Sequence, residues 1–248
     1  AFAVAATHGG GAAKRWGFAC PIDWWFWVAM VGQAGGSIAT EAGEFDLGGD
    51  AATEALRFWQ RLVYEDRVMR PPPGRDYNAW QVTNSEFLAG RVAMIWNSTA
   101  FVRYLEQNAK FPVVCAPLPR RVRHAVPTGG TMFVVPRDNP PHHDEAAQRF
   151  LSFMLRPERA NQFATNTGYI TVSKPGIALL ERQGYYAERP NDRVAVDQLG
   201  AVMPWPWHPE LFRVQREVVQ SRLEQAVLLR RDPKIAIEEA RRAIVENR

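Results

Sequence analysis

The residues best suited to bind a ligand are three small polar residues in a row, Asn97, Ser98 and Thr99. They follow the apolar stretch 92–96 and precede a helical pattern over 100–108. Asn, Ser and Thr cap helix N-termini, where unpaired backbone N–H groups and the helix dipole attract anions. The pattern therefore predicts a ligand contact where a helix begins after a buried strand.

Two further features could supply polar contacts. Gly129 and Gly130 precede the apolar stretch 132–136, and two glycines let backbone N–H groups approach a ligand closely, although a plain turn is equally compatible. Tyr169 follows Gly168, a residue typical of helix ends. Its phenol could donate to a phosphate or a hydroxyl, or its ring could pack in a core.

Arg216 is the candidate cation. In the long helix expected near the C-terminus it lies in line with Phe212, Val219 and Leu223, at spacings of i−4, i+3 and i+7. An Arg on an apolar stripe is half-buried and requires an anionic partner, whereas Arg213 on another side of the helix is expected to be solvated.

The chain contains nine Trp residues, and Trp often lies at surfaces that bind sugars or other proteins. Trp24 and Trp25 open a helix for which Asp23 is the expected N-cap. Either ring could stack on a ligand, although packing in a core is the commoner role of Trp.

Composition excludes several classes of protein. Apolar residues make up 46% and charged residues 23% of the chain, which is typical of a soluble globular protein. The net charge is +4, but basic and acidic residues are interleaved, so we expect no binding of nucleic acid. The longest apolar run, 24–31, is too short to span a bilayer.

Cofactor and metal chemistry has little support in the sequence. The adjacent His142 and His143 cannot share a helix face, and no zinc-ligand spacing is present, so we expect neither a metal nor a cofactor. Cys20 and Cys115 are expected to be buried and free, with a disulfide left open for an oxidising compartment. The sequence lacks a nucleophile elbow, a P-loop and the zinc-protease motif, so we expect a protein that is not an enzyme.

Short apolar stretches that could form strands alternate with helical patterns along the chain. The expected strands lie at 15–20, 92–96, 111–118 and 132–136. These strands and the helices between them must position the candidate residues.

Several motifs occur in a fixed order: FLAGRVAM, the capped NST, PLP, TGG before an apolar stretch, AAQRFLSF, PE and TGY. In this order and at these separations they resemble the family 1 extracellular solute-binding proteins of ABC importers, in particular the branch that binds sn-glycerol-3-phosphate. The resemblance covers roughly residues 15–245. No motif is specific by itself, so the ordered set carries the resemblance.

The resemblance implies a fold. It is α/β and of the class II periplasmic-binding-protein-like type, with two lobes that close on a solute about a hinge. Because members of the family are longer, we expect the N-terminal lobe to be incomplete in this chain. Residues 1–123 and 172–248 would form the second, C-terminal lobe, and residues 124–171 would be a segment of the first.

The resemblance also implies a set of solute contacts. The expected members are Ser98, Thr99, Gly129, Gly130, Tyr169, Arg216 and either Trp24 or Trp25. Hydroxyls, backbone N–H groups, a phenol and an Arg would form a phosphate cage, so the expected function is capture of sn-glycerol-3-phosphate or a glycerophosphodiester. The expected partners are the membrane permease subunits of an ABC importer. We expect a monomer in the periplasm or outside the cell, with lipid anchoring left open, although no signal peptide begins the chain.

Three other interpretations stay open. A neutral oligosaccharide of the trehalose or maltose type could stack on several of the Trp rings. A carbohydrate-active hydrolase is the alternative from another class of protein. The chain could also lack solute binding of its own, because residues 124–171 would have no sheet partners and would expose apolar surface.

Overall fold

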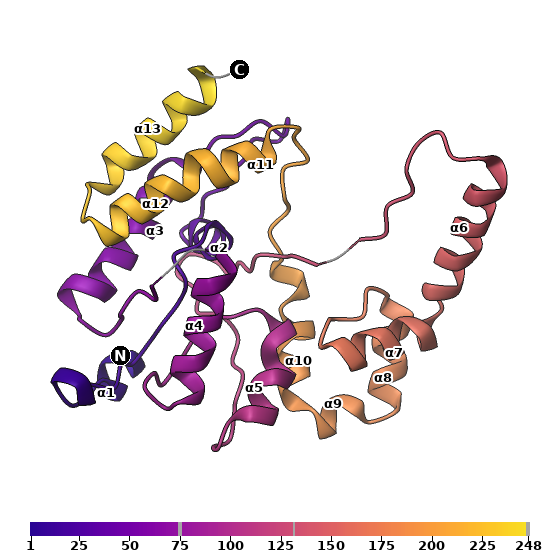
Figure 1. Cartoon of the computed structure of the whole chain (residues 1–248), viewed down its shortest axis with the longest axis horizontal. Coiled ribbons are helices and arrows are strands. Elements are labelled where there is room, and N and C mark those ends of the chain that lie inside the picture. The colour runs from indigo at the N-terminus through magenta and orange to yellow at the C-terminus, as the bar shows by residue number, and fades with distance from the viewer. Residues whose placement is uncertain (74–75, 131, 247–248) are drawn as a thin grey trace. The chain divides into compact units, whose positions relative to one another are not determined.

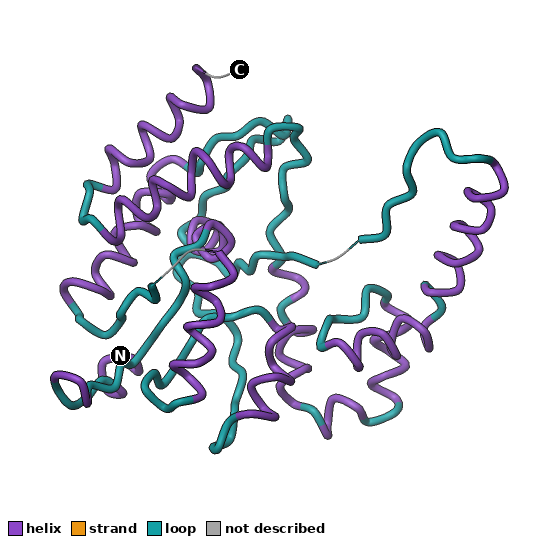
Figure 2. The backbone as a smooth tube through the Cα atoms, in the orientation of Figure 1, coloured by secondary structure: helices purple, strands orange, loops and turns teal. Residues whose placement is uncertain are grey.

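The computed structural model of the protein describes residues 1–73, 76–130 and 132–246. In these ranges the chain consists of helices joined by loops, and both are drawn in Figures 1 and 2. The regular strands predicted for an α/β chain are replaced there by short extended segments.

The chain forms two compact units. The first consists of Ala1–Asn97, Leu118–Thr128 and Ala201–Arg248, and the second consists of Ser98–Pro117 and Gly129–Gly200. The backbone therefore passes from one unit to the other four times. The unit boundaries do not coincide with the lobe boundaries expected after residues 123 and 171, so the assignment of segments to lobes stays a prediction.

The first unit contains the helices of the N-terminal and C-terminal parts of the chain. They are α1 (Phe2–Ala6), η1 (Gly11–Ala13), α2 (Trp24–Gln33), α3 (Gly49–Gln60), η2 (Arg61–Glu65), α4 (Asp76–Leu88), α11 (Leu211–Arg213), η5 (Val214–Val219), α12 (Gln220–Leu228) and α13 (Pro233–Glu246). The segments η2 and η5 are π-helical. Since α11, η5 and α12 follow one another without a break, they form the long C-terminal helix that the sequence predicts.

The second unit contains the helices of the middle of the chain. They are η3 (Thr99–Phe101), α5 (Val102–Asn108), α6 (Pro141–Met154), α7 (Pro157–Thr167), α8 (Lys174–Arg182), α9 (Tyr185–Glu188) and α10 (Pro190–Asp197), with η4 (Leu199–Ala201) at its boundary. Within this unit α8 packs against both α7 and α9, and α9 packs against α10.

The core of the first unit surrounds α2. Asp23 caps this helix as predicted, since its Oδ1 accepts a hydrogen bond of 2.8 Å from the backbone N–H of Trp25. Apolar residues occupy almost every position, so α2 is buried on all sides and only Trp25 in it stays partly exposed. The helix α3 packs against α2, and α12 and α13 pack against α3.

Two of the predicted strands pair with each other in the first unit. Residues 16–19 run parallel to residues 92–95, with backbone N–H groups of Trp16 and Ala93 donating to Arg91 and Trp16 over 2.9 Å. Phe18 pairs on its other side with the segment at Met69. The pairings remain isolated bridges, so these segments are extended and paired as predicted but too short to form regular strands.

The other two predicted strands, 111–118 and 132–136, are extended without a paired neighbour in the part of the chain that the structure describes. The prediction of regular strands is therefore wrong there, because a strand exists only beside a partner that accepts and donates its backbone hydrogen bonds. As a consequence Val114, Phe133 and Val134 are exposed.

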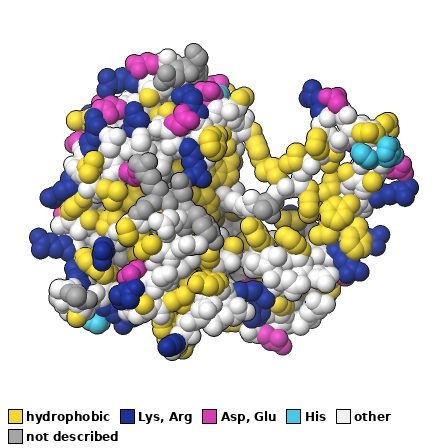
Figure 3. Space-filling model, viewed as in Figure 1, with side chains coloured by type: hydrophobic (Ala, Val, Ile, Leu, Met, Phe, Trp, Pro, Cys, Tyr) yellow, Lys and Arg dark blue, Asp and Glu magenta, His cyan; other side chains and the backbone are white. Residues whose placement is uncertain are grey.

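The second unit has a small core. Its buried apolar residues are Val102, Leu105, Ala160, Ala164, Leu180, Tyr186 and Ala195. The helix α6 contributes none, although it carries an apolar side that includes Phe150 and Phe153. Phe150 instead meets the ring of the exposed Phe133 at 5.4 Å, and Figure 3 shows apolar side chains on this part of the surface.

The two cysteines are free, as expected, and they lie in different units. Burial raises the pKa of the Cys20 thiol well above its usual value, and burial also raises the pKa of the half-buried Cys115, to about 11. Both thiols therefore stay protonated at neutral pH.

None of the helices described is both long enough and apolar enough to cross a bilayer.

Candidate functional site

The polar segment after residue 96 begins a helix, as the sequence predicts. Ser98 is the N-cap, and its Oγ accepts a hydrogen bond of 3.3 Å from the backbone N–H of Ala100. The first turn is the 3₁₀ helix η3, which continues directly into α5. Ser98 is half-buried and Thr99 is exposed, so the Thr99 hydroxyl is accessible from solvent.

The end of α7 places Tyr169 beside this helix start. Pro157 occupies the first turn of α7, and Gly168 ends the helix with a φ of 81°, a conformation that glycine adopts without strain. A Cβ at Gly168 would lie 3.3 Å from the carbonyl oxygen of Ala100, so a larger residue would press on η3. Glycine thus ends the helix and lets the two segments approach closely.

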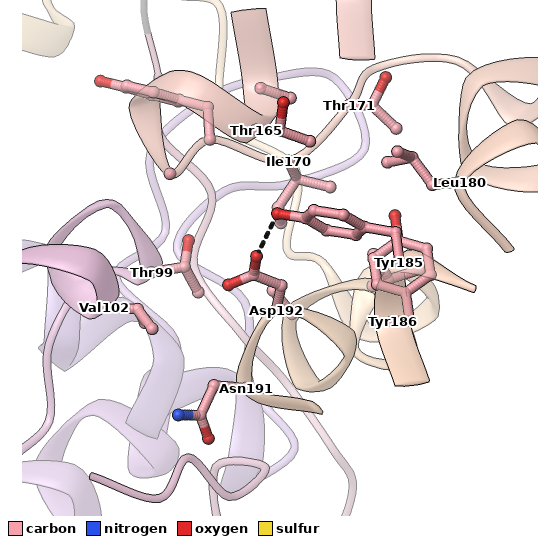
Figure 4. Close-up of a pocket in the computed structure, with 15 residues that line it drawn as sticks. Thr99, Val102, Thr165, Ile170, Thr171, Leu180, Tyr185, Tyr186, Asn191 and Asp192 are labelled. Carbon is pink, nitrogen blue, oxygen red and sulfur yellow. Dashed lines mark hydrogen bonds between the residues drawn. The ribbon is translucent and has the colours of Figure 1, made fainter. Parts of the chain in front are cut away.

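Thr99 and Tyr169 line a pocket in the second unit, shown in Figure 4. The pocket has about 380 Å³ of atom-free space, counting the part that is open to solvent. Its other lining residues come from α5, α7, α8, α9, α10 and residues 170–171. Tyr185 and Asp192 both line it, and the Tyr185 hydroxyl donates a hydrogen bond of 2.5 Å to Asp192 Oδ2.

An ionic cluster beside this pocket joins α5 to α10. Asp192 Oδ2 accepts from Arg189 Nε at 3.2 Å, and Arg189 Nη2 donates to Glu106 Oε2 at 2.7 Å. Arg103 on α5 donates to the Tyr185 hydroxyl at 2.9 Å. Burial, and next the hydrogen bond to Asp192, raise the pKa of Tyr185 to about 12, so its hydroxyl remains a donor at neutral pH.

The sequence analysis missed this cluster. Tyr185 and Asp192 belong to none of the motifs named in the sequence analysis, and only the spacing of three residues between Arg189 and Asp192 signals an ion pair there. The partners on α5 are more than 80 residues away in the chain, so no local pattern could show them.

Gly130 lies next to Tyr169 in the second unit. A Cβ at Gly130 would be 3.9 Å from Cε1 of Tyr169, which is ordinary contact distance. Both Gly129 and Gly130 are exposed, so their backbones are accessible. The second unit therefore contains five of the expected solute contacts, from three stretches of the chain: Ser98 and Thr99, Gly129 and Gly130, and Tyr169.

The two candidate tryptophans lie in the first unit and differ in exposure. Trp24 is 1% exposed and offers a solute no surface in this structure. Trp25 is half-buried, and its Nε1 donates a hydrogen bond of 2.9 Å to the carbonyl oxygen of Thr128. One edge of the Trp25 indole is thus held by the protein while part of its surface stays accessible.

The prediction that Arg216 is half-buried on an apolar stripe is wrong, because its side chain is exposed. Arg216 lies in the π-helical segment η5, where the hydrogen bonds span five residues instead of four. The buried positions are Val214, Val218 and Val219. The prediction used the spacing of a regular α-helix, whereas the buried residues here follow the wider turn of a π-helix. Phe212 is exposed as well.

Arg213 also differs from expectation. Its side chain is half-buried and pairs with Glu210, so it is not the solvated residue that the helical pattern indicates.

In the described residues, no group of three or more His, Cys, Asp and Glu side chains is placed to hold a metal ion.

Comparison with known proteins identifies relatives. A sequence model of the bacterial extracellular solute-binding proteins matches residues 2–179. The sn-glycerol-3-phosphate-binding periplasmic protein UgpB of Salmonella typhimurium is 24% identical over 168 residues, which cover 64% of this chain and 38% of that protein. UgpB of Pectobacterium atrosepticum is 23% identical over 165 residues, which cover 62% of this chain and 37% of that protein. The chain therefore matches well under half the length of these curated relatives.

Solved structures resemble nearly the whole chain. UgpB from Mycobacterium tuberculosis in complex with glycerophosphocholine has a TM-score of 0.76 and 22% identity, and the match covers 95% of this chain and 58% of that one. Maltose-bound MalE3 of T. maritima has a TM-score of 0.75 and 19% identity, with 94% and 61% covered. These likenesses confirm the predicted fold class, that of the two-lobed periplasmic binding proteins.

Proposed function

The chain belongs to the family of bacterial extracellular solute-binding proteins, and we propose that it serves as the solute-binding component of an ABC importer. The proposed solute is sn-glycerol-3-phosphate or a glycerophosphodiester. The proposed partners are the membrane permease subunits of the importer. The proposed location is the periplasm or the outside of the cell, as the names of the matched relatives suggest.

One observation carries the choice of solute. In the second unit, stretches far apart in the sequence meet: Thr99 and Tyr169 line one pocket, and a Cβ at Gly130 would lie 3.9 Å from the Tyr169 ring. Hydroxyls, a phenol and accessible backbone N–H groups are all hydrogen-bond donors, and several donors together suit the oxygens of a phosphate ester.

The first unit supplies two further groups in this proposal. Arg216, an exposed residue, contributes the positive charge, since Arg matches the geometry of a phosphate with two parallel N–H donors. Trp25 contributes a ring surface to the glycerol or head-group part of the solute. Trp24, being buried, is left out of the proposed set.

Relatives support this solute. UgpB of Salmonella typhimurium is by name a protein that binds sn-glycerol-3-phosphate, and the crystal structure of UgpB from Mycobacterium tuberculosis contains glycerophosphocholine. We also propose that the protein acts as a monomer without binding nucleic acid, since its basic residues are interleaved with acidic ones.

Calorimetry tests the proposal. The chain is titrated with sn-glycerol-3-phosphate, with glycerophosphocholine and with inorganic phosphate. Arg216→Ala should weaken binding of the phosphate esters about 10- to 100-fold, because a charge-assisted hydrogen bond contributes about 1.5–3 kcal/mol. Arg242→Ala is the matched control, since it removes the same charge from another exposed position of the first unit. Equal affinities of the two variants would refute the assigned role of Arg216.

A neutral oligosaccharide is the second candidate. The ring of Trp25 stays partly exposed, which suits a ring that stacks on a sugar, and maltose-bound MalE3 is one of the matched structures. Titration with maltotriose and trehalose separates the two solutes. Binding of these sugars, with no heat from the phosphate esters, would replace the first proposal by the second.

A further inference from the structure

The backbone carbonyl of Thr128 accepts hydrogen bonds from two tryptophans. Nε1 of Trp25 donates over 2.9 Å and Nε1 of Trp205 donates over 2.7 Å. Trp25 belongs to α2, whereas Trp205 lies in the loop between η4 and α11, so the two indoles come from separate parts of the first unit. Thr128 is the last residue of its segment in that unit, and Gly129 begins the next segment of the second unit.

Each indole is also fixed by its other contacts. The Trp25 ring meets Trp80 at 5.5 Å and Phe26 edge-on at 5.1 Å. The Trp205 ring stacks on the buried Trp24, with ring centres 6.1 Å apart and an angle of 24° between the planes. Aromatic pairs at such distances prefer defined orientations, so both N–H groups point where packing directs them.

The segment before Thr128 is held as well. The N–H of Val126 donates to Ala201 and the N–H of Met203 donates to Val126, both over 2.9 Å, so the chain entering Thr128 runs beside the chain that leads to Trp205. Both lie on α2, since a Cβ at Gly32 would come within 2.7 Å of the Cβ of Ala125 and within 2.5 Å of the sulfur of Met203. The carbonyl and its two donors are thus attached to one rigid support.

We propose that Trp205 is a positioning residue for solute binding that acts through the peptide bond between Thr128 and Gly129. A trans peptide is planar, and its N–H points opposite to its C=O. Two donors that hold the Thr128 carbonyl therefore fix the direction of the Gly129 N–H, one of the solute contacts assigned above. The same carbonyl holds the edge of Trp25, so Trp205 also acts on the orientation of that ring. This inference rests on the proposed function.

Trp205→Phe is the test variant. Phe keeps a ring to stack on Trp24 but removes the N–H, so the carbonyl loses one donor while the core stays filled. Trp207→Phe is the matched control. Trp207 lies two residues away and is exposed, and the substitution removes the same N–H group from a residue that is not one of the two donors to Thr128. If Trp205→Phe does not fold, Trp205→Tyr replaces it, because the Tyr ring has its hydroxyl at a different place from the indole N–H.

The first measurement needs no solute. Loss of a hydrogen bond to a carbonyl shifts the amide nitrogen resonance of the next residue, so Trp205→Phe should move the Gly129 amide signal in ¹⁵N NMR spectra, and Trp207→Phe should not. Trp25→Phe removes the other donor and should move the same signal in the same direction. An unchanged Gly129 signal in Trp205→Phe would overturn the proposal.

The second measurement is solute affinity by calorimetry. Trp205→Phe should weaken the binding of sn-glycerol-3-phosphate or glycerophosphocholine about two- to tenfold, the range expected when one neutral hydrogen bond is lost. Trp207→Phe should bind as the unsubstituted chain does. Unchanged affinity in Trp205→Phe would overturn the positioning role. Absence of binding by the unsubstituted chain would instead refute the proposed function and with it the solute role of Trp205. The Gly129 signal alone would then test whether Trp205 orients the peptide bond between Thr128 and Gly129.

Discussion

Asp192→Asn should destabilise the second unit more than any change at its surface. Asp192 Oδ2 accepts hydrogen bonds from the Tyr185 hydroxyl at 2.5 Å and from Arg189 Nε at 3.2 Å, and it lies 3.9 Å from an Nη of Arg103. These contacts join α5 to α9 and α10 in a unit that has few buried apolar residues. The ionic cluster therefore contributes stability to this unit that a larger apolar core would otherwise supply.

The expected loss follows from these contacts. A hydrogen bond to a charged group contributes about 1.5–3 kcal/mol, and breaking a fully buried ion pair costs about 3–5 kcal/mol. The Asp192 side chain is 19% exposed, so solvent screens part of this, and Asn can still accept one hydrogen bond. We therefore expect a loss of about 2–3 kcal/mol in the free energy of unfolding, between the surface and the buried limits.

Amide hydrogen exchange resolves where the loss occurs. In Asp192→Asn, amides of α5, α9 and α10 should exchange faster, whereas amides of α2 and α3 in the first unit should be unaffected. Asp197→Asn is the matched control on the same helix, because Asp197 pairs with Arg193 at the surface with 51% of its side chain exposed. Its cost should stay below about 0.5 kcal/mol.

Equal effects of the two substitutions would refute this reasoning. In that case the cluster would be no more important than an ordinary surface ion pair. Loss of protection in α2 and α3 at the same rate as in α5 would also contradict it, since the two units would then unfold together.

Three further predictions concern packing, pH and surface. Gly32→Ala should lower the free energy of unfolding by about 1–3 kcal/mol in urea titrations because the site has no room for a methyl group, whereas Gly200→Ala, which meets no atom within 4 Å, should change it little. The pKa of Tyr185 is raised to about 12 in the folded chain, so the folded state holds this proton longer and stability should fall as pH rises from about 10 towards 12; Tyr185→Phe should reduce that fall in urea titrations across the range. Phe133→Ser and Phe150→Ser should reduce the fluorescence of a bound apolar dye such as ANS while leaving the unfolding midpoint nearly unchanged, because both rings are already exposed.

Helix ends were the most predictable part of this structure. The Asp23 and Ser98 caps and the Gly168 stop form where the sequence indicates. Each depends on a side chain that bonds its own backbone a few residues away, or on a conformation that glycine adopts without strain. Such local causes are present in the sequence itself.

Strand pairing was less predictable because it depends on residues elsewhere. The stretches 15–20 and 92–96 have the composition of strands and pair with each other. The stretches 111–118 and 132–136 have the same composition, but neither is paired with another segment among the described residues. A period-two or apolar pattern reports what a segment could do beside a neighbour, and it does not report whether the neighbour is there.

The candidate site shows the same division. Thr99, Gly130 and Tyr169 come together in the second unit, and the resemblance to a family named all three. The exposure of Arg216 could not be predicted, because the π-helical turn that rotates it out of the apolar stripe leaves no clear mark in the sequence. The choice between Trp24 and Trp25 likewise depended on which ring the core buries.

The exposure of helix α6 should make this part of the chain susceptible to proteases. A helix of 14 residues without a single buried side chain draws little stability from tertiary packing, and short helices are marginal in water by their own propensity. The salt bridge between Glu145 and Arg149 lies within the helix and is exposed to solvent. Residues 141–154 should therefore open while the rest of the second unit stays folded, and limited trypsin digestion should cut the chain at Arg149 within this helix.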